Sequence, residues 1–302
     1  MPNTPFGRAV AAIATPFDSD LGVDSARLIG HAEWLFGNGC DGLVLFGTTG
    51  EAASLTLDER KLTLEALIAA GIGANRIIVG TGCCAIADTV ELTRHAGEAG
   101  AAGALILPPY FYKGVSDDGI ARYYDRVIAG CGVSLPPVYL YHIPQVAGAG
   151  VGPEVVGQLL DRHGSKIRGY KDSSGKWDNT QALIGRFPSL EVYVGSETLL
   201  LETLRAGGAG CISAGVNVQP AAVRETADNW RAENADSFQA AAEIVRTILE
   251  KSAPLIPAVK AVLSHLHRHD GWITTRPPLD PMPNAAAQRL MLELRACGLR
   301  AS

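Results

Sequence analysis

Short apolar segments alternate with longer amphipathic segments along most of the chain. The apolar segments are about four to six residues long and do not alternate strictly between apolar and polar positions. This pattern is typical of strands in a parallel sheet whose two faces are both covered. We predict eight such strands, at residues 9–14, 42–46, 76–80, 103–107, 137–141, 167–171, 190–194 and 210–214.

The segments between the strands have the spacing of amphipathic helices. Asp24, for example, is a candidate cap for a helix that places Leu28, Ala32 and Leu35 on one face. Because strand and helix alternate eight times, we expect a (β/α)8 TIM barrel rather than an open doubly wound sheet. No Gly-x-Gly-x-x-Gly sequence follows the first strand, which argues against a dinucleotide-binding fold. The helices are predicted at 24–36, 58–71, 86–99, 117–129, 153–163, 177–186, 197–206 and 219–231.

The C-terminal part of the chain has helical periodicity and no strand pattern. Three helices are predicted there, at 235–251, 255–268 and 284–298. No linker or low-complexity tract separates this part from the rest. We therefore expect a barrel over residues 1–232 and a helical appendage, residues 233–302, packed on it.

Composition and charge exclude several classes of protein. The 302 residues are 47% hydrophobic and 19% charged, so the chain can bury a large core and is not intrinsically disordered. A net charge of −5 offers no basis for binding nucleic acid or an anionic membrane surface. The first residues lack the pattern of a secretory signal, and no apolar run reaches the roughly 18–20 residues that span a bilayer. Six scattered cysteines are typical of free thiols in a reducing compartment, so we expect a cytoplasmic protein.

Lys171 is a candidate nucleophile. In a (β/α)8 barrel the catalytic groups lie at the carboxyl ends of the strands, and Lys171 ends the predicted sixth strand. If side chains alternate along that strand, Lys171 points towards the barrel axis. Burial disfavours an ammonium ion, and the free amine is the form that attacks a carbonyl. The alternative is that Lys171 forms an ion pair with Asp172 at the strand end.

Other strand ends carry further polar groups. Tyr141 ends the fifth strand, where a phenol could carry protons to and from a carbinolamine, although a core tyrosine with one hydrogen bond is the alternative. After the second strand, Gly47-Thr48-Thr49-Gly50 offers backbone N–H groups and hydroxyls that suit a carboxylate or phosphate. An ordinary loop could have the same sequence. The seventh strand is followed by Gly195, Ser196 and Glu197.

Three histidines in the appendage resemble a metal-binding cluster. His265 and His269 would share one face of a helix, with His267 between them. No further ligand is indicated nearby. We therefore predict solvated or capping histidines and no metal site.

Five segments have an order and spacing that are shared with one known family. They are Gly47-Thr48-Thr49-Gly50-Glu51, Tyr141-His142-Ile143-Pro144, Gly169-Tyr170-Lys171-Asp172, Gly210-Cys211-Ile212-Ser213 and Pro257-Ala258-Val259-Lys260. In these segments, and over essentially its whole length, the chain resembles the dihydrodipicolinate synthase / N-acetylneuraminate lyase family of pyruvate-dependent class I aldolases. The resemblance implies a (β/α)8 barrel with three C-terminal helices, assembled as a homotetramer that is a dimer of dimers.

The resemblance also implies roles for individual residues. Lys171 is similar to the lysine that forms a Schiff base with pyruvate, so no separate cofactor is expected. Tyr141 resembles the tyrosine that moves protons, and Thr48 the hydroxyl that links this tyrosine towards solvent. Thr49 and the adjacent backbone, including Gly47, would hold the pyruvate carboxylate. The main-chain carbonyl of Ile212 would face the bound keto acid.

Two departures from the family pattern bear on the second substrate. Dihydrodipicolinate synthases carry an arginine five residues after the tyrosine, where this chain has Val146. An aliphatic side chain cannot bind a carboxylate through two charged hydrogen bonds. A tyrosine that reaches the site mouth across the dimer interface aligns with Phe111, so Tyr110 or Tyr112 would have to replace it.

The remaining similarities favour a hydroxylated substrate. Ser173 supplies the hydroxyl that sialic-acid lyases use two residues after the lysine. Glu197 is the one counterpart of the acidic residues that those enzymes use after the seventh strand, and Gly195, two residues before it, is a further candidate for substrate binding. Their later serine aligns with Ala214, which disfavours neuraminate. We therefore predict a lyase that makes or breaks a C–C bond between pyruvate and an aldehyde, acting on a hydroxylated 2-keto acid. The alternatives are dihydrodipicolinate synthase and a keto-acid dehydratase or deaminase that uses the same imine. A catalytically silent barrel used for binding or regulation is a third alternative, which the presence of Lys171, Tyr141 and Thr48 disfavours.

Overall fold

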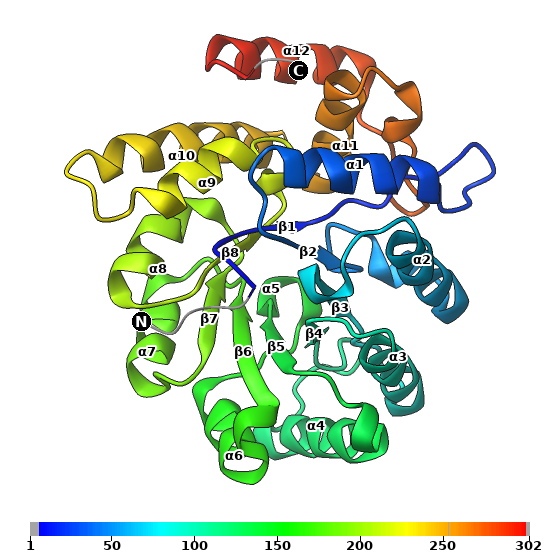
Figure 1. Ribbon diagram of the computed structural model, residues 1–302, viewed down its shortest axis with the longest axis vertical. Coiled ribbons are helices and arrows are strands. Elements are labelled where there is room, and N and C mark those ends of the chain that lie inside the picture. The colour runs from blue at the N-terminus through cyan, green and yellow to red at the C-terminus, as the bar shows by residue number, and fades with distance from the viewer. Residues whose placement is uncertain (1–5, 253, 300–302) are drawn as a thin grey trace.

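Eight parallel strands form a closed barrel in the computed structural model, which describes residues 6–252 and 254–299 (Figure 1). Each strand pairs with its neighbours along the chain, and β1 pairs with β8 to close the sheet, with Val10 opposite Ile212. The predicted strands and the (β/α)8 architecture are therefore confirmed. The strands are β1 Ala9–Ala12, β2 Gly42–Leu45, β3 Ile77–Gly80, β4 Gly103–Ile106, β5 Val138–His142, β6 Ile167–Asp172, β7 Glu191–Val194 and β8 Gly210–Ser213.

Helices follow the strands as predicted, with differences at a few ends. The helix α8 begins at Leu200 because Glu197–Leu199 form a 3-10 turn, η5. The single turn α5, Pro144–Ala147, was not predicted because four residues are too few to show an amphipathic period. The other barrel helices are α1 Ser25–Gly37, α2 Leu57–Ala69, α3 Ile86–Glu98, α4 Asp117–Cys131, α6 Pro153–His163, α7 Trp177–Arg186, α8 Leu200–Ala206 and α9 Pro220–Asp228.

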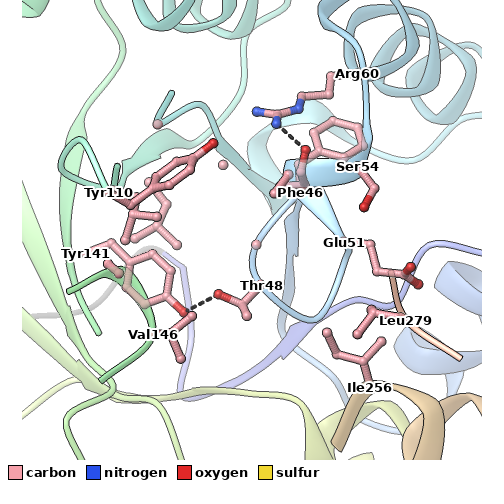
Figure 2. Close-up of a pocket in the computed structure, with 18 of the residues that line it drawn as sticks. Phe46, Thr48, Glu51, Ser54, Arg60, Tyr110, Tyr141, Val146, Ile256 and Leu279 are labelled. Carbon is pink, nitrogen blue, oxygen red and sulfur yellow. Dashed lines mark hydrogen bonds between the residues drawn. The ribbon is translucent and has the colours of Figure 1, made fainter. Parts of the chain in front are cut away.

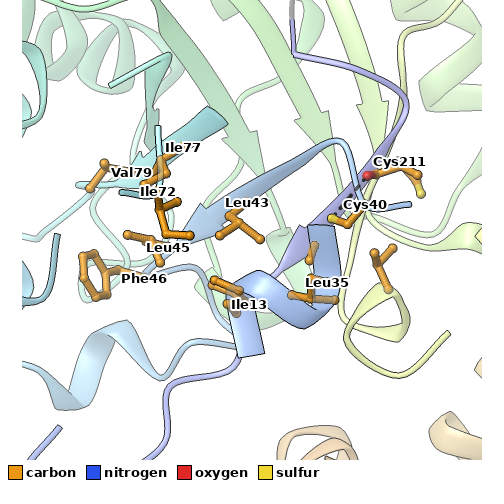
Figure 3. Packing of buried hydrophobic residues seen from close by; sticks show 14 of the residues in the cluster. Ile13, Leu35, Cys40, Leu43, Leu45, Phe46, Ile72, Ile77, Val79 and Cys211 are labelled. Carbon is orange, nitrogen blue, oxygen red and sulfur yellow. Dashed lines mark hydrogen bonds between the residues drawn. The ribbon is translucent and has the colours of Figure 1, made fainter. Parts of the chain in front are cut away.

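The strands are buried on both faces, which explains their continuous apolar sequence. In β2, Val44 points into the barrel, where it packs in the same cluster as Tyr139. Leu43 and Leu45 point outward and lie with Leu35 of α1 in the layer between strands and helices (Figure 3). All three strand residues are at most 1% exposed.

The C-terminal helices pack against one side of the barrel, beside α1 and α9 (Figure 1). They are α10 Ala235–Lys251, α11 Leu255–Leu266 and α12 Asn284–Ala296, with the 3-10 turn η7, Asp270–Ile273, after α11. Their buried side chains form a common cluster with residues of the barrel, such as Val262 and Trp272 with Val218. The appendage therefore shares a hydrophobic core with the barrel.

A chain of polar side chains also crosses from the barrel to the appendage. The Oδ1 atom of Asn217 accepts a hydrogen bond from the backbone N–H of Ala14 and lies 3.2 Å from Nε2 of the buried His31. The other ring nitrogen of His31 lies 2.9 Å from Nε2 of His267. Burial, and secondarily the proximity of His267, lowers the pKa of His31 to about 3. His31 is therefore neutral in the folded protein at physiological pH.

The helices and the cysteines bear on the setting in which the protein works. No helix in the described residues combines the length and the apolar character needed to cross a membrane. All six cysteines are free thiols, of which Cys84 and Cys297 are exposed and the others are buried.

Candidate active site

The side chains of Lys171, Tyr141 and Thr48 meet at the carboxyl ends of β6, β5 and β2. Nζ of Lys171 lies 4.3 Å from the centre of the Tyr141 ring. The hydroxyl of Tyr141 is hydrogen-bonded to Oγ1 of Thr48 at 3.1 Å. All three residues line a cavity of about 360 Å³, and Lys171 is 3% exposed. The arrangement places an amine, a phenol and a second hydroxyl in sequence around one space.

Lys171 points into the barrel because of its place on β6. Its neighbour Tyr170 packs outward, where its hydroxyl donates to the backbone of Val151 at 2.7 Å. The carboxylate of Asp172 accepts hydrogen bonds from Ser174 and, through Oδ2, from two side chains of the α7 region, Asn179 at 2.9 Å and Thr180 at 2.7 Å. Among the described residues no ion pair joins Asp172 to Lys171. The structure therefore does not show the alternative role of Lys171 as the partner of Asp172.

The loop after β2 presents Thr48 and Thr49 to the cavity. Phe46 and Glu51, at the two ends of the loop, have left-handed backbone conformations with φ of 55° and 54°. These conformations are uncommon for residues other than glycine, and they turn the chain sharply at both ends of the loop. Both threonines then line the cavity, with Thr49 8% exposed.

Three further candidates line the same cavity, namely Ser173, Gly195 and Ile212. Gly195 packs directly against Ser173, and a Cβ atom at residue 195 would lie 2.1 Å from the Ser173 hydroxyl. The absence of a side chain at Gly195 thus leaves the space that the Ser173 side chain occupies.

A second cavity of about 290 Å³ shares Tyr141 and Thr48 with the first (Figure 2). It is lined by the candidates Gly47 and Tyr110, while Val146 on α5 lines both cavities. Burial raises the pKa of Tyr110, so its phenol stays protonated at neutral pH. Phe111, by contrast, is 73% exposed and is not among the described residues that line either cavity.

Glu197 lies behind the cavity and is not among the described residues that line it. It is fully buried, and its carboxylate is hydrogen-bonded to the Ser213 hydroxyl and, at 3.1 Å, to Nε2 of Gln219. The guanidinium of Arg246 on α10 lies 3.7 Å from the same carboxylate. Glu197 therefore contacts protein groups, whereas the sequence suggested that it faces a substrate.

Arg246 and Glu250 were not identified from the sequence, yet both line the cavity. They are joined by a hydrogen bond of 2.8 Å across one turn of α10. Their helix belongs to the C-terminal appendage, and nothing in its apolar pattern shows which turn reaches the barrel mouth. A pair of opposite charges four residues apart was the only available signal, and such pairs are common on exposed helix faces.

The three histidines of the appendage do not form the cluster that their spacing resembles. Within residues 6–252 and 254–299, no three His, Cys, Asp or Glu side chains could hold one ion. His265, His267 and His269 diverge: His265 contacts Arg295, His267 contacts His31, and His269 accepts a hydrogen bond from the backbone of Gly271.

Comparison with known proteins identifies the family. The Dihydrodipicolinate synthetase family model matches residues 5–297. An uncharacterized DapA-like lyase of Chloroflexus aurantiacus is 35% identical over 298 residues, which cover 93% of this chain and 96% of that protein. The 4-hydroxy-tetrahydrodipicolinate synthase of Parasynechococcus marenigrum is 34% identical, with 93% of this chain and 92% of that protein covered.

Solved structures agree with this match. The crystal structure of dihydrodipicolinate synthase from Agrobacterium tumefaciens has a TM-score of 0.90 and 33% sequence identity, covering 97% of this chain and 99% of that chain. The fold and the matches define a lyase of the class I aldolase type that depends on pyruvate. The chain belongs to the Dihydrodipicolinate synthetase family.

Proposed function

We propose that Lys171 forms a Schiff base with pyruvate and that the enzyme uses this imine to make or break a C–C bond to a hydroxylated aldehyde. The observation that carries the proposal is the buried amine of Lys171, 4.3 Å from the centre of the Tyr141 ring, with the Tyr141 hydroxyl bonded to Thr48. A phenol and a second hydroxyl beside an amine provide the proton transfers that imine formation needs.

The proposed reaction begins when the amine of Lys171 attacks the keto carbon of pyruvate. Tyr141 transfers one proton from the nitrogen to the oxygen and relays a second proton to it from solvent through Thr48, and the oxygen leaves as water to give a protonated imine. Loss of a proton from the pyruvyl methyl group then gives an enamine, whose carbon bonds to the aldehyde carbon. The aldehyde oxygen takes up a proton, and water hydrolyses the imine to release the 2-keto acid and the free amine. Cleavage follows the same steps in reverse.

The proposed substrate pocket favours hydroxyl groups on the aldehyde. Ser173, Ser196 and Gln145 line the cavity of Lys171 and can donate or accept hydrogen bonds. Val146 stands where a synthase would need a guanidinium, and it offers no charged contact to a second carboxylate. Thr49 and the adjacent backbone would hold the carboxylate of pyruvate itself, and the carbonyl of Ile212 would face its keto group.

The second candidate is 4-hydroxy-tetrahydrodipicolinate synthase, which condenses pyruvate with aspartate semialdehyde. The name of the Parasynechococcus marenigrum relative supports it, and Val146 argues against it. A dehydratase or deaminase would begin from the same imine. Release of pyruvate from 2-keto-3-deoxy sugar acids, measured beside turnover of aspartate semialdehyde, distinguishes these activities.

Trapping of the imine tests the central proposal. The protein is incubated with pyruvate, reduced with borohydride, digested and mapped by mass spectrometry. We expect the adduct on Lys171 and none on Lys171→Met, while Lys166, a surface lysine close in sequence, serves as the internal control. An adduct that appears elsewhere, or none on the wild type, would overturn the proposal.

The proposal also covers the cofactor, the cellular compartment and the oligomeric state of the enzyme. The lysine imine replaces a separate cofactor, and the compartment is the cytoplasm. Family resemblance supports a homotetramer, a dimer of dimers, and the exposed Phe111 and Tyr112, with 73% and 70% exposure, offer apolar surface for such contacts. Sedimentation equilibrium tests the assembly: a monomer at micromolar concentration would contradict it.

A further inference from the structure

Glu51 and Lys260 form an ion pair inside the protein, between the barrel and the appendage. Both side chains are completely buried. Nζ of Lys260, on α11, also donates a hydrogen bond to the backbone carbonyl of Thr274 at 2.7 Å and lies 4.3 Å from the centre of the Phe17 ring. Burial lowers the pKa of Lys260 to about 8, although Glu51 acts in the opposite direction. The proposed reaction uses neither residue.

Glu51 ends the loop that carries Thr48. Its backbone N–H donates to the carbonyl of Thr48 at 3.1 Å, and the N–H of Ala52 donates to the carbonyl of Gly47 at 3.3 Å. Glu51 is also one of the two non-glycine residues of this loop with a left-handed backbone. Such conformations persist only where the surrounding structure holds them. The buried side chain of Glu51 is the part of the loop that reaches the appendage.

The appendage holds Glu51 from two directions. Lys260 of α11 pairs with Oε1, and the backbone N–H of Arg276 donates to Oε2 at 3.3 Å. The guanidinium of Arg276 is itself paired with Glu59 on α2. In Figure 2 Glu51 lies beside Leu279 and Ile256 of the appendage, while Thr48, from the same loop, faces Tyr141.

We propose that Glu51 and Lys260 are positioning residues for the proton transfers of the active site. Their ion pair fixes the end of the loop, and the loop in turn holds the hydroxyl of Thr48 against Tyr141. This inference rests on the proposed function, in which Tyr141 and Thr48 move protons during imine formation. It also gives the appendage a role in the reaction, because the cation of the pair comes from α11.

The test compares three variants with the wild type. Glu51→Gln removes the carboxylate charge with little change of shape, and Glu51→Gln/Lys260→Met removes both charges, which avoids an unpaired buried charge. Arg27→Met is the matched control, because Arg27 also joins the barrel to the appendage, through the carbonyl of Gly271 at 2.9 Å, without contacting the loop. For each protein we measure the rate of borohydride-trappable adduct formation with saturating pyruvate, the Tm, and deuterium exchange of the amides in the segment 47–52.

We expect adduct formation to slow about 10-fold to 100-fold in Glu51→Gln, the loss that follows a small misplacement of a reacting group. Exchange in 47–52 should rise in both Glu51 variants and stay unchanged in Arg27→Met. The double variant should recover Tm towards the wild type without recovering the rate. If its rate returns to within twofold of the wild type, or if Arg27→Met is slowed equally, the positioning role is wrong.

The exchange measurement needs no substrate, so it decides whether the ion pair fixes the loop even if the wild type traps no pyruvate. A wild type without an adduct would refute the proposed function alone. Unchanged exchange in 47–52 of the Glu51 variants would refute the positioning role alone.

Discussion

Nζ of Lys171 lies 4.3 Å from the centre of the Tyr141 ring, close to the face of the phenol that is bonded to Thr48. The two residues are neighbours in the sheet, since Tyr141 of β5 pairs in register with Lys171 of β6. Parallel pairing of two inward-facing positions therefore brings the proposed nucleophile and the proposed proton-transfer group together without any loop. The central part of the site is therefore carried by two strands of the barrel.

Replacing Tyr141 by Phe removes the phenolic hydroxyl and keeps the ring beside Lys171. We expect kcat for aldol cleavage to fall about 10²-fold to 10⁴-fold, the usual contribution of general acid–base catalysis. Rapid-quench trapping with pyruvate measures the imine-forming step directly. Tyr124→Phe is the control, because that hydroxyl donates to the backbone of Ile106 outside the cavity. A Tyr141→Phe rate within threefold of the wild type would show that protons reach the imine by another route.

Val146→Arg tests the proposed choice of aldehyde. Val146 is 61% exposed and lines the cavity of Lys171, so an arginine can be accommodated at its mouth. A charge-assisted hydrogen bond contributes about 1.5–3 kcal/mol, so kcat/KM for aspartate semialdehyde should rise roughly 10-fold to 100-fold. Val146→Lys should give a smaller gain, because an ammonium cannot form the two parallel bonds of a guanidinium. If the wild type, Val146→Arg and Val146→Lys have equal kcat/KM for aspartate semialdehyde, Val146 does not determine the choice of aldehyde.

Ser173→Ala tests whether hydroxyl groups of the substrate are recognised. The loss of one hydrogen bond of about 0.5–1.5 kcal/mol should lower kcat/KM for a hydroxylated 2-keto acid roughly 2-fold to 10-fold. Pyruvate trapping should stay within twofold of the wild type, since the proposed function assigns the carboxylate of pyruvate to Thr49 and the adjacent backbone and not to Ser173. The neighbouring Ser174→Ala is the control, because Ser174 is not among the described residues that line the cavity. The same loss in both variants would indicate a disturbance of the β6 end instead.

His31 makes the protein sensitive to acid. The pKa of His31 is about 3 in the folded protein and 6.5 in an unfolded chain, so below pH 6.5 the unfolded state binds a proton that the folded state does not. The free energy of unfolding therefore falls with decreasing pH between 6.5 and 3, by about 1.4 kcal/mol per pH unit for this one residue. Urea denaturation of His31→Gln should show a shallower decline, and that of His269→Gln, an exposed histidine, an unchanged one. Parallel curves for His31→Gln and the wild type would contradict this origin of acid sensitivity.

The sequence predicted the barrel well because its strands have a strong signal. A strand whose two faces are both buried requires a continuous apolar segment, as in β2, where Leu43 and Val44 are buried on opposite faces. The inward direction of Lys171 was also predictable, because side chains alternate along a strand. The ends of the predicted strands therefore located most of the candidate site from the amino-acid sequence alone.

The contacts between side chains on different helices and loops could not be predicted from the sequence. Glu197 follows a strand end like other candidates, but the proximity of Arg246, 49 positions later in the chain, depends on how α10 packs on the barrel. The ion pair between Glu51 and Lys260 has the same origin. Sequence spacing reveals neighbours within one element, whereas these contacts depend on the relative placement of two elements.

The hydrogen bonds that the Asp172 carboxylate accepts leave the amine of Lys171 without this neighbour as an ion-pair partner. Three donors from the following loop and helix occupy the carboxylate oxygens, so Asp172 does not serve as the counter-ion of the adjacent Lys171. In the proposed reaction the amine is consumed and regenerated in every cycle, and it would otherwise have to leave and rejoin such a partner each time. Under the proposed function, the part of the cavity that receives the aldehyde can therefore differ between relatives without removing an ion-pair partner of Lys171.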